Sequence, residues 1–243
     1  MSAGEGPVRT LSVFFPMYNE RQNIPRALSE AVRVLPTLGL DRWELIVVDD
    51  GSVDGCAALV EEAIHAMPPD GELRLVRHSK NEGYGKALQT GFAAARLDAV
   101  FYTDADLPVD LSDIARALPL LAEAQVVIGY RTGRRETLIR DVYSTGYNAL
   151  MQLMFGVRVH DVNFSFKLIR RSALLGVKLS ARSVFIDGEL LAEARRCGLS
   201  LAEIPVAYQA RRHGTSAFNS PKVVWAALRE MLAYRFDKST GST

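Results

Sequence analysis

The sequence is short of cysteine and has almost no net charge. Its 243 residues include 29 Lys and Arg against 28 Asp and Glu, which leaves a net charge of +1. A chain so balanced has no general field to attract nucleic acid, so we expect no nucleic-acid partner. The two cysteines, Cys56 and Cys197, lack the spacing of a metal site or a redox pair. Their pattern favours two buried free thiols in a reducing cytosol.

Long apolar runs are missing as well. Residues 1–9 are polar and lack the apolar segment of a secretory signal. Further along, charged residues interrupt every apolar stretch before it reaches the roughly 20 residues of a membrane-crossing helix. We therefore expect a cytoplasmic protein that is soluble or lies peripherally at the inner face of a membrane.

The first half of the sequence alternates strand-like runs, rich in β-branched and aromatic residues, with amphipathic helical runs. The expected strands are residues 11–15, 44–49, 73–77, 99–103 and 126–129. The expected helices are residues 22–35, 54–67, 86–97 and 111–123, with Asp54 and Ser112 as N-caps of two of them. This alternation is typical of a mostly parallel sheet covered by helices.

The second half is less regular, and no linker separates it from the first. We expect helices at residues 137–155, 185–197 and 221–236, and strands at 165–170 and 200–208. The sequence therefore predicts one Rossmann-like α/β domain over residues 1–243, with a mixed, mostly parallel central sheet and helices on both faces.

Polar clusters follow four of the first five expected strands, at residues 16–20, 49–52, 81–85 and 104–106. Any one of them alone is consistent with an ordinary loop, because Asp, Asn and Gly are common in turns. In an open α/β sheet, however, ligands bind at the carboxyl ends of the strands. Four clusters at equivalent strand ends therefore predict a ligand site along one edge of the sheet.

Two of these residues, Asp104 and Asp106, can converge on one point directly after an apolar strand. Hard cations prefer oxygen ligands, and Mg²⁺ is usually held by one or two carboxylates together with substrate phosphates. We therefore predict a Mg²⁺ or Mn²⁺ site that suits a nucleotide diphosphosugar. A calcium-binding EF-hand is excluded, because Pro108, Val109 and Ala115 occupy its third ligand, turn-glycine and glutamate positions.

A run of glycines at 83, 85 and 91 does not form a dinucleotide fingerprint, since the third glycine of G-x-G-x-x-G would fall at Leu88. A glycine-lined loop still allows close approach of a ligand to the backbone. Lys86, which follows it, is a candidate contact to a substrate phosphate. The alternative is a lysine on a solvated helix face.

Taken together, seven motifs spread over nearly the whole chain resemble those of the dolichol-phosphate-mannose-synthase-like glycosyltransferases of family 2. The motifs are Pro16-x-Tyr18-Asn19-Glu20, Val47-Val48-Asp49-Asp50-Gly51-Ser52-x-Asp54-Gly55, Asn81-x-Gly83-x-Gly85-x-Ala87, Thr103-Asp104-Ala105-Asp106-Leu107, Gly129-Tyr130-Arg131, Asp161-x-x-x-Ser165-Phe166-Lys167 and Arg211-x-x-Gly214-x-Ser216. The resemblance implies a GT-A fold and an inverting transfer from a GDP- or UDP-sugar. It also implies a nucleotide-sugar-binding half at about 9–130 and an acceptor-binding half at about 131–220.

The same resemblance implies roles for single residues. It places the base and ribose of the donor at Pro16, Tyr18, Glu20 and Asp50, and the metal, diphosphate and sugar at Asp104 and Asp106. It places the acceptor phosphate at Arg131, Arg140, Ser144 and Arg211, and Asp161 and Ser216 of the last two motifs are further substrate-binding candidates. Guanidinium groups suit this task because they bind phosphate bidentately. The chain departs from the family at Pro108, where a glutamine is usual, and at Ala217, where a lysine is usual.

A general base is not evident in the second half. A hydroxyl acceptor needs one, whereas a lipid monophosphate is already anionic near neutral pH. Asp161, Asp187 and Glu189 are its well-placed carboxylates, and the family pattern gives the last two structural or donor-side roles. We therefore favour a polyprenyl-phosphate-like acceptor. The alternatives are a soluble transferase acting on a small hydroxylated or phosphorylated metabolite, and a nucleotide-binding module without catalysis, which the intact aspartate pair argues against.

The last expected helix, residues 221–236, has two interpretations. Its apolar residues at helical spacing are Val224, Leu228, Met231 and Leu232, and its flanks carry Lys222, Arg229, Arg235 and Lys238 with the rings of Trp225, Tyr234 and Phe236. In one interpretation the apolar stripe packs on the protein's own sheet or on a second subunit of a homodimer. In the other, the helix docks at a membrane surface.

Overall fold

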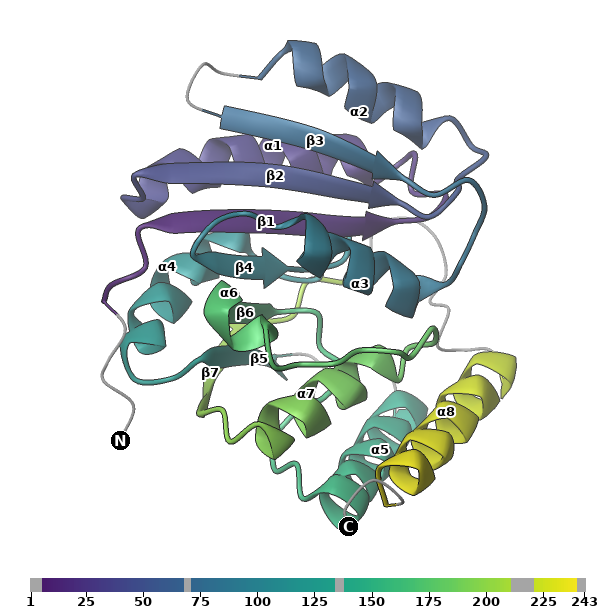
Figure 1. Ribbon diagram of the computed structural model, residues 1–243. Coiled ribbons are helices and arrows are strands. Elements are labelled where there is room, and N and C mark those ends of the chain that lie inside the picture. The colour runs from purple at the N-terminus through teal and green to yellow at the C-terminus, as the bar shows by residue number, and fades with distance from the viewer. Residues whose placement is uncertain (1–5, 68–70, 134–137, 211–220, 240–243) are drawn as a thin grey trace.

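The computed structural model describes residues 6–67, 71–133, 138–210 and 221–239 (Figure 1). Its strands are β1 (Thr10–Met17), β2 (Arg42–Asp49), β3 (Gly71–Arg77), β4 (Ala99–Tyr102), β5 (Val126–Thr132), β6 (Lys167–Arg170) and β7 (Leu201–Ala207). Its α-helices are α1 (Ile24–Val34), α2 (Cys56–His65), α3 (Tyr84–Ala94), α4 (Ile114–Ala117), α5 (Leu138–Phe155), α6 (Arg171–Leu174), α7 (Ile186–Arg196) and α8 (Pro221–Ser239).

Strands from both halves of the chain share one sheet, in the order β3-β2-β1-β4-β6-β5-β7. β1 pairs in parallel with β2 and β4, and β3 and β7 extend the sheet in parallel with β2 and β5. β6 is antiparallel to both of its neighbours, β4 and β5. The predicted mixed, mostly parallel sheet is therefore confirmed. Because β6 alone runs in the opposite direction, the other six strands end at the same edge.

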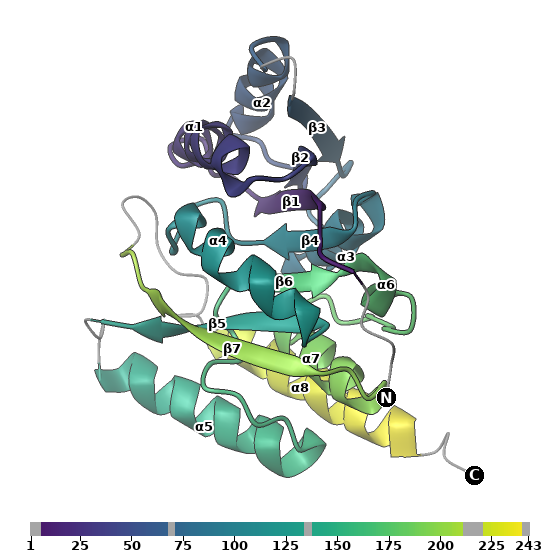
Figure 2. The same ribbon diagram turned by 90° about the vertical axis from the view of Figure 1, so that its left-hand side faces the viewer.

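The sheet is buried on both faces, as a largely parallel sheet requires. In β1, Val13 and Phe15 belong to one core cluster, with residues of α1, α2 and α4. Phe14 belongs to the other, with residues of α3 and α7. Gly91 of α3 lies over Phe14, and a Cβ on this glycine would be 2.4 Å from the ring. Figure 2 shows α1 and α4 on one side of the sheet and α3 and α6 on the other, as predicted.

The second core extends to α5 and α8, which pack with α7. Met151 of α5 and Ala227 and Met231 of α8 are buried there. The ring of Tyr234 lies 5.5 Å from that of Phe155. One face of α8 therefore packs on the protein's own core, in agreement with the first interpretation of this helix. Neither α8 nor any other helix of the described ranges is long and apolar enough to cross a membrane.

The expected single helix over residues 111–123 is wrong. The segment contains α4 between two 3₁₀ turns, Leu111–Asp113 and Leu118–Ala122. Pro119 explains the second turn, because proline has no N–H to donate and clashes with the preceding helical turn. The N-cap is also different from the prediction. The carboxylate of Asp110 accepts a hydrogen bond from Ser112 N at 2.9 Å, so Asp110 is the cap and Ser112 lies inside the first turn.

The prediction of two buried thiols holds for Cys56 and is wrong for Cys197. Cys197 directly follows the last residue of α7, where the chain returns to the surface, and it is partly exposed. Its Sγ donates a hydrogen bond to the carbonyl oxygen of Gly176 at 3.2 Å. Both cysteines are free.

Candidate active site

The candidate site lies at the edge of the sheet where β1, β2 and β4 end. From β1 the chain first adds β2 and β3 on one side of the sheet and then returns to add β4 on the other side. The direction of strand addition therefore reverses between β1 and β4, which makes this a topological switch point. Ligands of open α/β sheets bind at such a point. The four polar clusters predicted from the sequence follow β1, β2, β3 and β4 along this edge (Figure 1).

The loops after β1 and β2 are tied to each other by hydrogen bonds. Asn19 N donates to Ser52 Oγ at 2.9 Å, and Asn19 Oδ1 accepts from Val53 N at 3.0 Å. Arg21 N donates to Asp54 Oδ2 at 2.9 Å. Asn19 has a φ of 55°, a left-handed conformation that asparagine adopts more readily than most residues. The two loops therefore form one connected surface beside the switch point.

The four residues predicted to surround the base and ribose differ in accessibility. Pro16 is buried within β1, and Asp50 is only 2% exposed. Glu20 is partly buried, and its carboxylate accepts a hydrogen bond from Asn23 Nδ2 at 2.5 Å. Tyr18 is 47% exposed, so its side chain is the most accessible of the four to a ligand.

Asp50 uses its carboxylate to hold the loop that precedes α3. Its oxygens accept hydrogen bonds from Glu82 N at 2.8 Å and from Gly83 N at 2.9 Å. One of them also lies 2.7 Å from Nδ1 of His78, whose Nε2 lies 2.9 Å from Thr90 Oγ1. Asp50 thus shapes this end of the edge through the loop, and a direct contact between Asp50 and a ribose stays a prediction.

The glycine loop packs on the protein itself. Gly85 N donates to the carbonyl oxygen of Arg182 at 2.9 Å, and Gln89 Nε2 donates to that of Ala181 at 2.8 Å. A Cβ at Gly85 would lie 2.2 Å from the Ala181 oxygen. The close approach that requires Gly85 is therefore to segment 181–182, and approach of a ligand to the backbone of this loop stays a prediction. Lys86 is partly exposed in the first turn of α3, and its contact with a phosphate stays a prediction.

Asp104 and Asp106 lie in a tight turn directly after β4. Leu107 N donates to the carbonyl oxygen of Asp104 at 3.0 Å, and Leu107 has a φ of 51°. A left-handed conformation is uncommon for a leucine, so the turn is strained, as turns at functional sites often are. Tyr84 Oη donates to Asp104 Oδ1 at 3.0 Å, and the side chain of Ser165 also forms a hydrogen bond with this carboxylate. These two partners come from α3 and from the loop before β6.

The environment of this pair fits a divalent cation. The pKa of Asp104 is raised to about 7, because burial and the nearby charges of Asp106 and Asp187 outweigh the opposing hydrogen bonds from Ser165 and Tyr84. A cation between Asp104 and Asp106 would offset their repulsion. Among the described residues, no group of three or more His, Cys, Asp or Glu could hold a metal ion. The remaining ligands would therefore be phosphate oxygens or water, as is usual for Mg²⁺.

A buried ion pair behind Asp104 was missed by the sequence analysis. Lys167 Nζ lies 2.5 Å from Asp187 Oδ1 and donates to the carbonyl oxygen of Phe164 at 2.9 Å. Tyr102 Oη donates to the same Asp187 oxygen, and burial beside this carboxylate raises the pKa of Tyr102. Lys167 and Asp187 join β6 to α7 beneath the turn. The signal in the sequence was the lysine of the Ser-Phe-Lys motif, but its partner is 20 residues away.

On the acceptor side, Arg131 forms a two-pronged ion pair with Asp161. Its Nε lies 2.6 Å from one carboxylate oxygen, and a terminal nitrogen lies 3.2 Å from the other. The guanidinium also lies 5.7 Å from the ring centroid of Phe164 and 5.8 Å from that of Tyr208. Three of the five N–H donors of an arginine remain for another ligand after such a pairing. The structure therefore brings Arg131 and Asp161 together and holds the guanidinium in place.

The other predicted acceptor residues are less fully placed. Ser144 is partly buried in α5, which begins shortly after β5. Arg140 lies in the first turns of α5, but its side chain is not among those described. Arg211 and Ser216 lie outside the described residues. The roles assigned to these four residues stay predictions.

The chain matches the family model described as glycosyl transferase family 2 over residues 12–176. It is 31% identical over 221 residues to undecaprenyl-phosphate 4-deoxy-4-formamido-L-arabinose transferase of Pectobacterium carotovorum, which covers 89% of this chain and 65% of the relative. It is 32% identical over 225 residues to the transferase of the same name from Pseudomonas fluorescens, which covers 90% of this chain and 63% of the relative. The chain thus spans just under two thirds of the length of these relatives.

Glucosyl-3-phosphoglycerate synthase of Mycobacterium tuberculosis has a similar fold. Its structure with Mn²⁺ and UDP-glucose has a TM-score of 0.69 at 22% identity, over 92% of this chain and 79% of the other. Its structure with Mg²⁺ and UDP has a TM-score of 0.69 at 20% identity, over 93% of this chain and 79% of the other. These similarities confirm the predicted GT-A fold. The family model matches well over half of the chain and shows that it belongs to glycosyl transferase family 2.

Proposed function

We propose that this chain is an inverting, metal-dependent glycosyltransferase that transfers one sugar from a GDP- or UDP-sugar to a polyprenyl-phosphate-like acceptor. The observation that carries the proposal is the carboxylate pair Asp104 and Asp106 at the switch point of the sheet. Their proximity and burial raise the pKa of one of them to about 7, which a bound cation would offset. Membership of glycosyl transferase family 2 agrees with this chemistry.

The donor would lie across the ends of β1, β2 and β4. Tyr18 would contact the base, and Pro16, Glu20 and Asp50 would shape the pocket for base and ribose. Lys86 would face a phosphate. Mg²⁺ or Mn²⁺ held by Asp104 and Asp106 would neutralise the charge that develops on the leaving diphosphate. The structure of similar fold that contains Mn²⁺ together with UDP-glucose is consistent with this arrangement.

The carboxylates of the second half already have ion-pair or hydrogen-bond partners, which favours a phosphate acceptor. Asp161 pairs with Arg131, and Asp187 pairs with Lys167. Glu189 accepts hydrogen bonds from the backbone and side chain of Ser180. A carboxylate held in this way is poorly placed to remove the proton of a hydroxyl acceptor, whereas a phosphate monoester needs no such base. The names of the two relatives identify them as sugar transferases and include undecaprenyl phosphate.

In the proposed step, a phosphate oxygen of the acceptor forms a bond to the anomeric carbon on the face opposite the leaving group. The bond between that carbon and the diphosphate oxygen breaks, and its electron pair leaves with the nucleoside diphosphate. Attack from the opposite face inverts the configuration. Arg131, with Arg140, Ser144 and Arg211, would hold the acceptor phosphate in line for this displacement.

An acceptor of this kind lies in a membrane, and we propose peripheral contact of α8 with the inner face of a membrane. Trp225 and Phe236 are 70% and 66% exposed on α8, and Lys222 and Arg229 are exposed beside them. Aromatic rings and cationic side chains together favour the interface of an anionic membrane. A second copy of the chain is the alternative occupant of this face, and the oligomeric state in solution distinguishes the two.

The test is a transfer assay with GDP- and UDP-sugars and a short-chain polyprenyl phosphate, with Mn²⁺ or with EDTA. We expect glycosylated lipid phosphate with Mn²⁺ and none with EDTA.

Asp106→Ala should abolish both transfer and the heat of Mn²⁺ binding in calorimetry while circular dichroism remains unchanged, since Asp106 lies in a turn. Asp104→Ala should have the same effect in weaker form. Transfer at full rate without a divalent ion would contradict the proposal, and product formed only on a small metabolite would favour the soluble alternative.

A further inference from the structure

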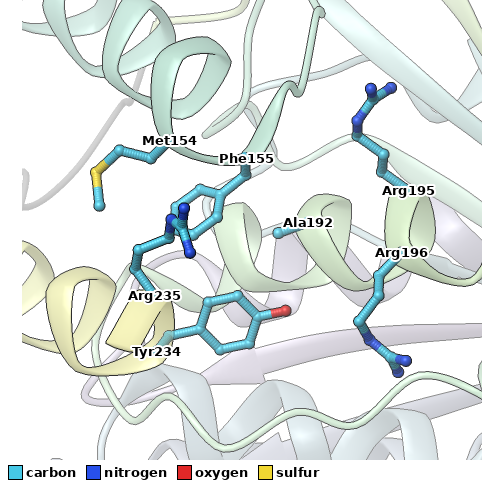
Figure 3. Close-up of a pocket in the computed structure, with 7 residues that line it drawn as sticks. All are labelled: Met154, Phe155, Ala192, Arg195, Arg196, Tyr234 and Arg235. Atoms are coloured by element: carbon cyan, nitrogen blue, oxygen red, sulfur yellow. The ribbon is translucent and has the colours of Figure 1, made fainter. Parts of the chain in front are cut away.

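A cavity of about 470 Å³ lies between the C-terminal parts of α5, α7 and α8 (Figure 3). Arg195 and Arg196 line it from α7, Arg235 lines it from α8, and the rings of Phe155 and Tyr234 form much of its apolar wall. Figure 3 shows Arg235 beside the ring of Phe155, with Arg195 and Arg196 across the cavity. Within the described part of the chain, no carboxylate is among the lining residues. The cavity is therefore both cationic and apolar.

The neighbouring carboxylate, Glu193, pairs with Arg196 and leaves the positive charges of Arg195 and Arg235 in place. Glu193 is fully buried, and it accepts hydrogen bonds from Arg196 at 2.7 Å and from Tyr234 Oη at 2.5 Å. Arg195 lies over Gly156, where a Cβ would be 2.8 Å from its Nε. Arg195 and Arg235 are both exposed. Arg196 is therefore held by Glu193, whereas the guanidinium groups of Arg195 and Arg235 are accessible to a ligand from solvent.

The cavity continues an exposed face of α8. Trp225, Leu232 and Phe236 are 70%, 48% and 66% exposed, and their spacing of seven and four residues places them on one side of the helix. The buried residues of α8, Ala227 and Met231, face the other side. An apolar face that stays exposed while the opposite face is buried in the core is typical of an interaction surface. Arg235 belongs both to α8 and to the cavity wall.

The cavity is separate from the candidate active site. Glu230 of α8 accepts hydrogen bonds from the backbone of Arg182 and Ser183, just before α7 begins, and this is the segment that supports the glycine loop. Tyr234, one turn further along α8, reaches Glu193 near the end of α7. The active-site edge and the cavity therefore lie at opposite ends of α7, which is 11 residues long, or about 15 Å at the rise of an α-helix.

We propose that this cavity binds the phosphate headgroup of an anionic membrane phospholipid. Arg235, beside the ring of Phe155, would bind the phosphate bidentately, and Arg195 would supply a second positive charge from across the cavity. The rings of Phe155 and Tyr234 would contact the apolar part next to the phosphate. The exposed rings of α8 would enter the interface beside the headgroup. One specific lipid contact would then orient α8 on the surface and keep the active-site edge beside the membrane. The proposal does not depend on the transfer reaction, because none of the lining residues belongs to the candidate active site.

The test exploits the difference between arginine and lysine. Arg195→Lys together with Arg235→Lys keeps the charge but removes the forked geometry that binds phosphate. The matched control is Arg33→Lys together with Arg42→Lys, which makes the same change at two exposed arginines of α1 and β2, away from α8 and the cavity. Co-sedimentation would be measured with vesicles of phosphatidylcholine with and without phosphatidylglycerol. We expect the double variant to bind the anionic vesicles about tenfold more weakly, in line with the loss of charge-assisted hydrogen bonds, and the control to bind like the unchanged protein.

Three results would overturn the proposal. The first is an unchanged protein that does not bind anionic vesicles. The second is a double variant that binds them as well as the control does, since attraction to the diffuse charge of the surface does not depend on arginine geometry. The third is thermal stabilisation by inorganic phosphate, lost in the double variant, without any vesicle binding, because the site would then serve a free phosphate. Transfer to a water-soluble short-chain acceptor is measured in parallel, so that failure of the proposed reaction is seen separately.

Discussion

At the scale of single residues, the most informative group is Asp104. Its pKa is raised to about 7 from 3.8, first by burial and then by the charge of Asp106. A carboxyl group with a raised pKa contributes stability at low pH, and that contribution is lost as the pH rises through the folded-state pKa. Ionised Asp104 therefore destabilises the folded protein without metal, and a bound cation would offset this destabilisation.

We predict that Asp104→Asn, measured without metal, is more stable relative to the unchanged protein at about pH 8 than at about pH 5. The amide cannot ionise, so it avoids the cost that the carboxylate incurs above its pKa. Thermal unfolding in EDTA across this range measures the effect. Asp110→Asn is a useful control, because hydrogen bonds from Ser112 lower the pKa of Asp110, so its contribution to stability changes only below about pH 4 and stays constant across this range. A difference between Asp104→Asn and the unchanged protein that is constant with pH would contradict the shifted pKa.

A second residue-scale prediction concerns Tyr84, which donates to Asp104 at 3.0 Å. Tyr84→Phe should weaken Mn²⁺ binding by about tenfold or less, because one hydrogen bond that holds the carboxylate in place is lost. Tyr147→Phe is the matched control, since the Tyr147 hydroxyl is buried without a hydrogen-bond partner in the described part of the chain. Calorimetric titration with Mn²⁺ compares the two. Equal affinities in both variants would show that Tyr84 does not position the aspartate.

At the scale of elements, the acceptor side depends on how β5, α5 and the loop before β6 are arranged. β5 presents Arg131, the loop presents Asp161, and the two side chains form a forked ion pair. We predict that Arg131→Ala, Arg140→Ala and Arg211→Ala each weaken acceptor binding in the transfer reaction. The expected loss of binding free energy is about 1.5–3 kcal/mol, the range for hydrogen bonds to charged groups. Nucleotide affinity should change less. Equal losses of nucleotide affinity in all three variants would place these arginines on the donor.

The two faces of α8 lead to another element-scale prediction. Met231 is fully buried against α5 and α7, whereas its neighbour Leu232 is 48% exposed. Met231→Ala should lower the free energy of unfolding by about 2–5 kcal/mol, because it leaves a cavity in the core. Leu232→Ala should change it by about 0.5 kcal/mol or less. Chemical denaturation of both variants measures the contrast, and similar values for the two would mean that α8 is not packed on this face.

At the scale of the whole molecule, the sheet unites the two halves. β4 from the first half pairs with β6 from the second, and their register places Tyr102 opposite Lys167. The aspartate turn after β4 and the loop that carries Ser165 therefore meet at one edge. The same arrangement places the buried pair of Lys167 and Asp187 behind Asp104. The regions predicted to bind donor and acceptor, which are far apart in sequence, thus share one sheet.

The sequence by itself determined the strands, most of the helices and the edge of the sheet where the polar clusters gather. These features depend on side-chain periods of 2 and 3.6 residues and on polar residues at strand ends, which are local properties of the chain. The aspartate pair was identified for the same reason, because Asp104 and Asp106 directly follow a strand. The family resemblance was carried by motifs that are equally local, and the match over residues 12–176 confirms it.

Only the tertiary structure decided which polar groups meet. Asp50 looked like a ligand contact in the sequence, yet its oxygens hold the loop of Glu82 and Gly83. Gly85 accommodates segment 181–182, almost a hundred residues away, and the partner of Lys167 is Asp187. α8 has apolar residues on two opposite faces, and its packing determines which of them is buried. Contacts between distant segments depend on how the sheet and helices are assembled, and no local sequence pattern predicts that assembly.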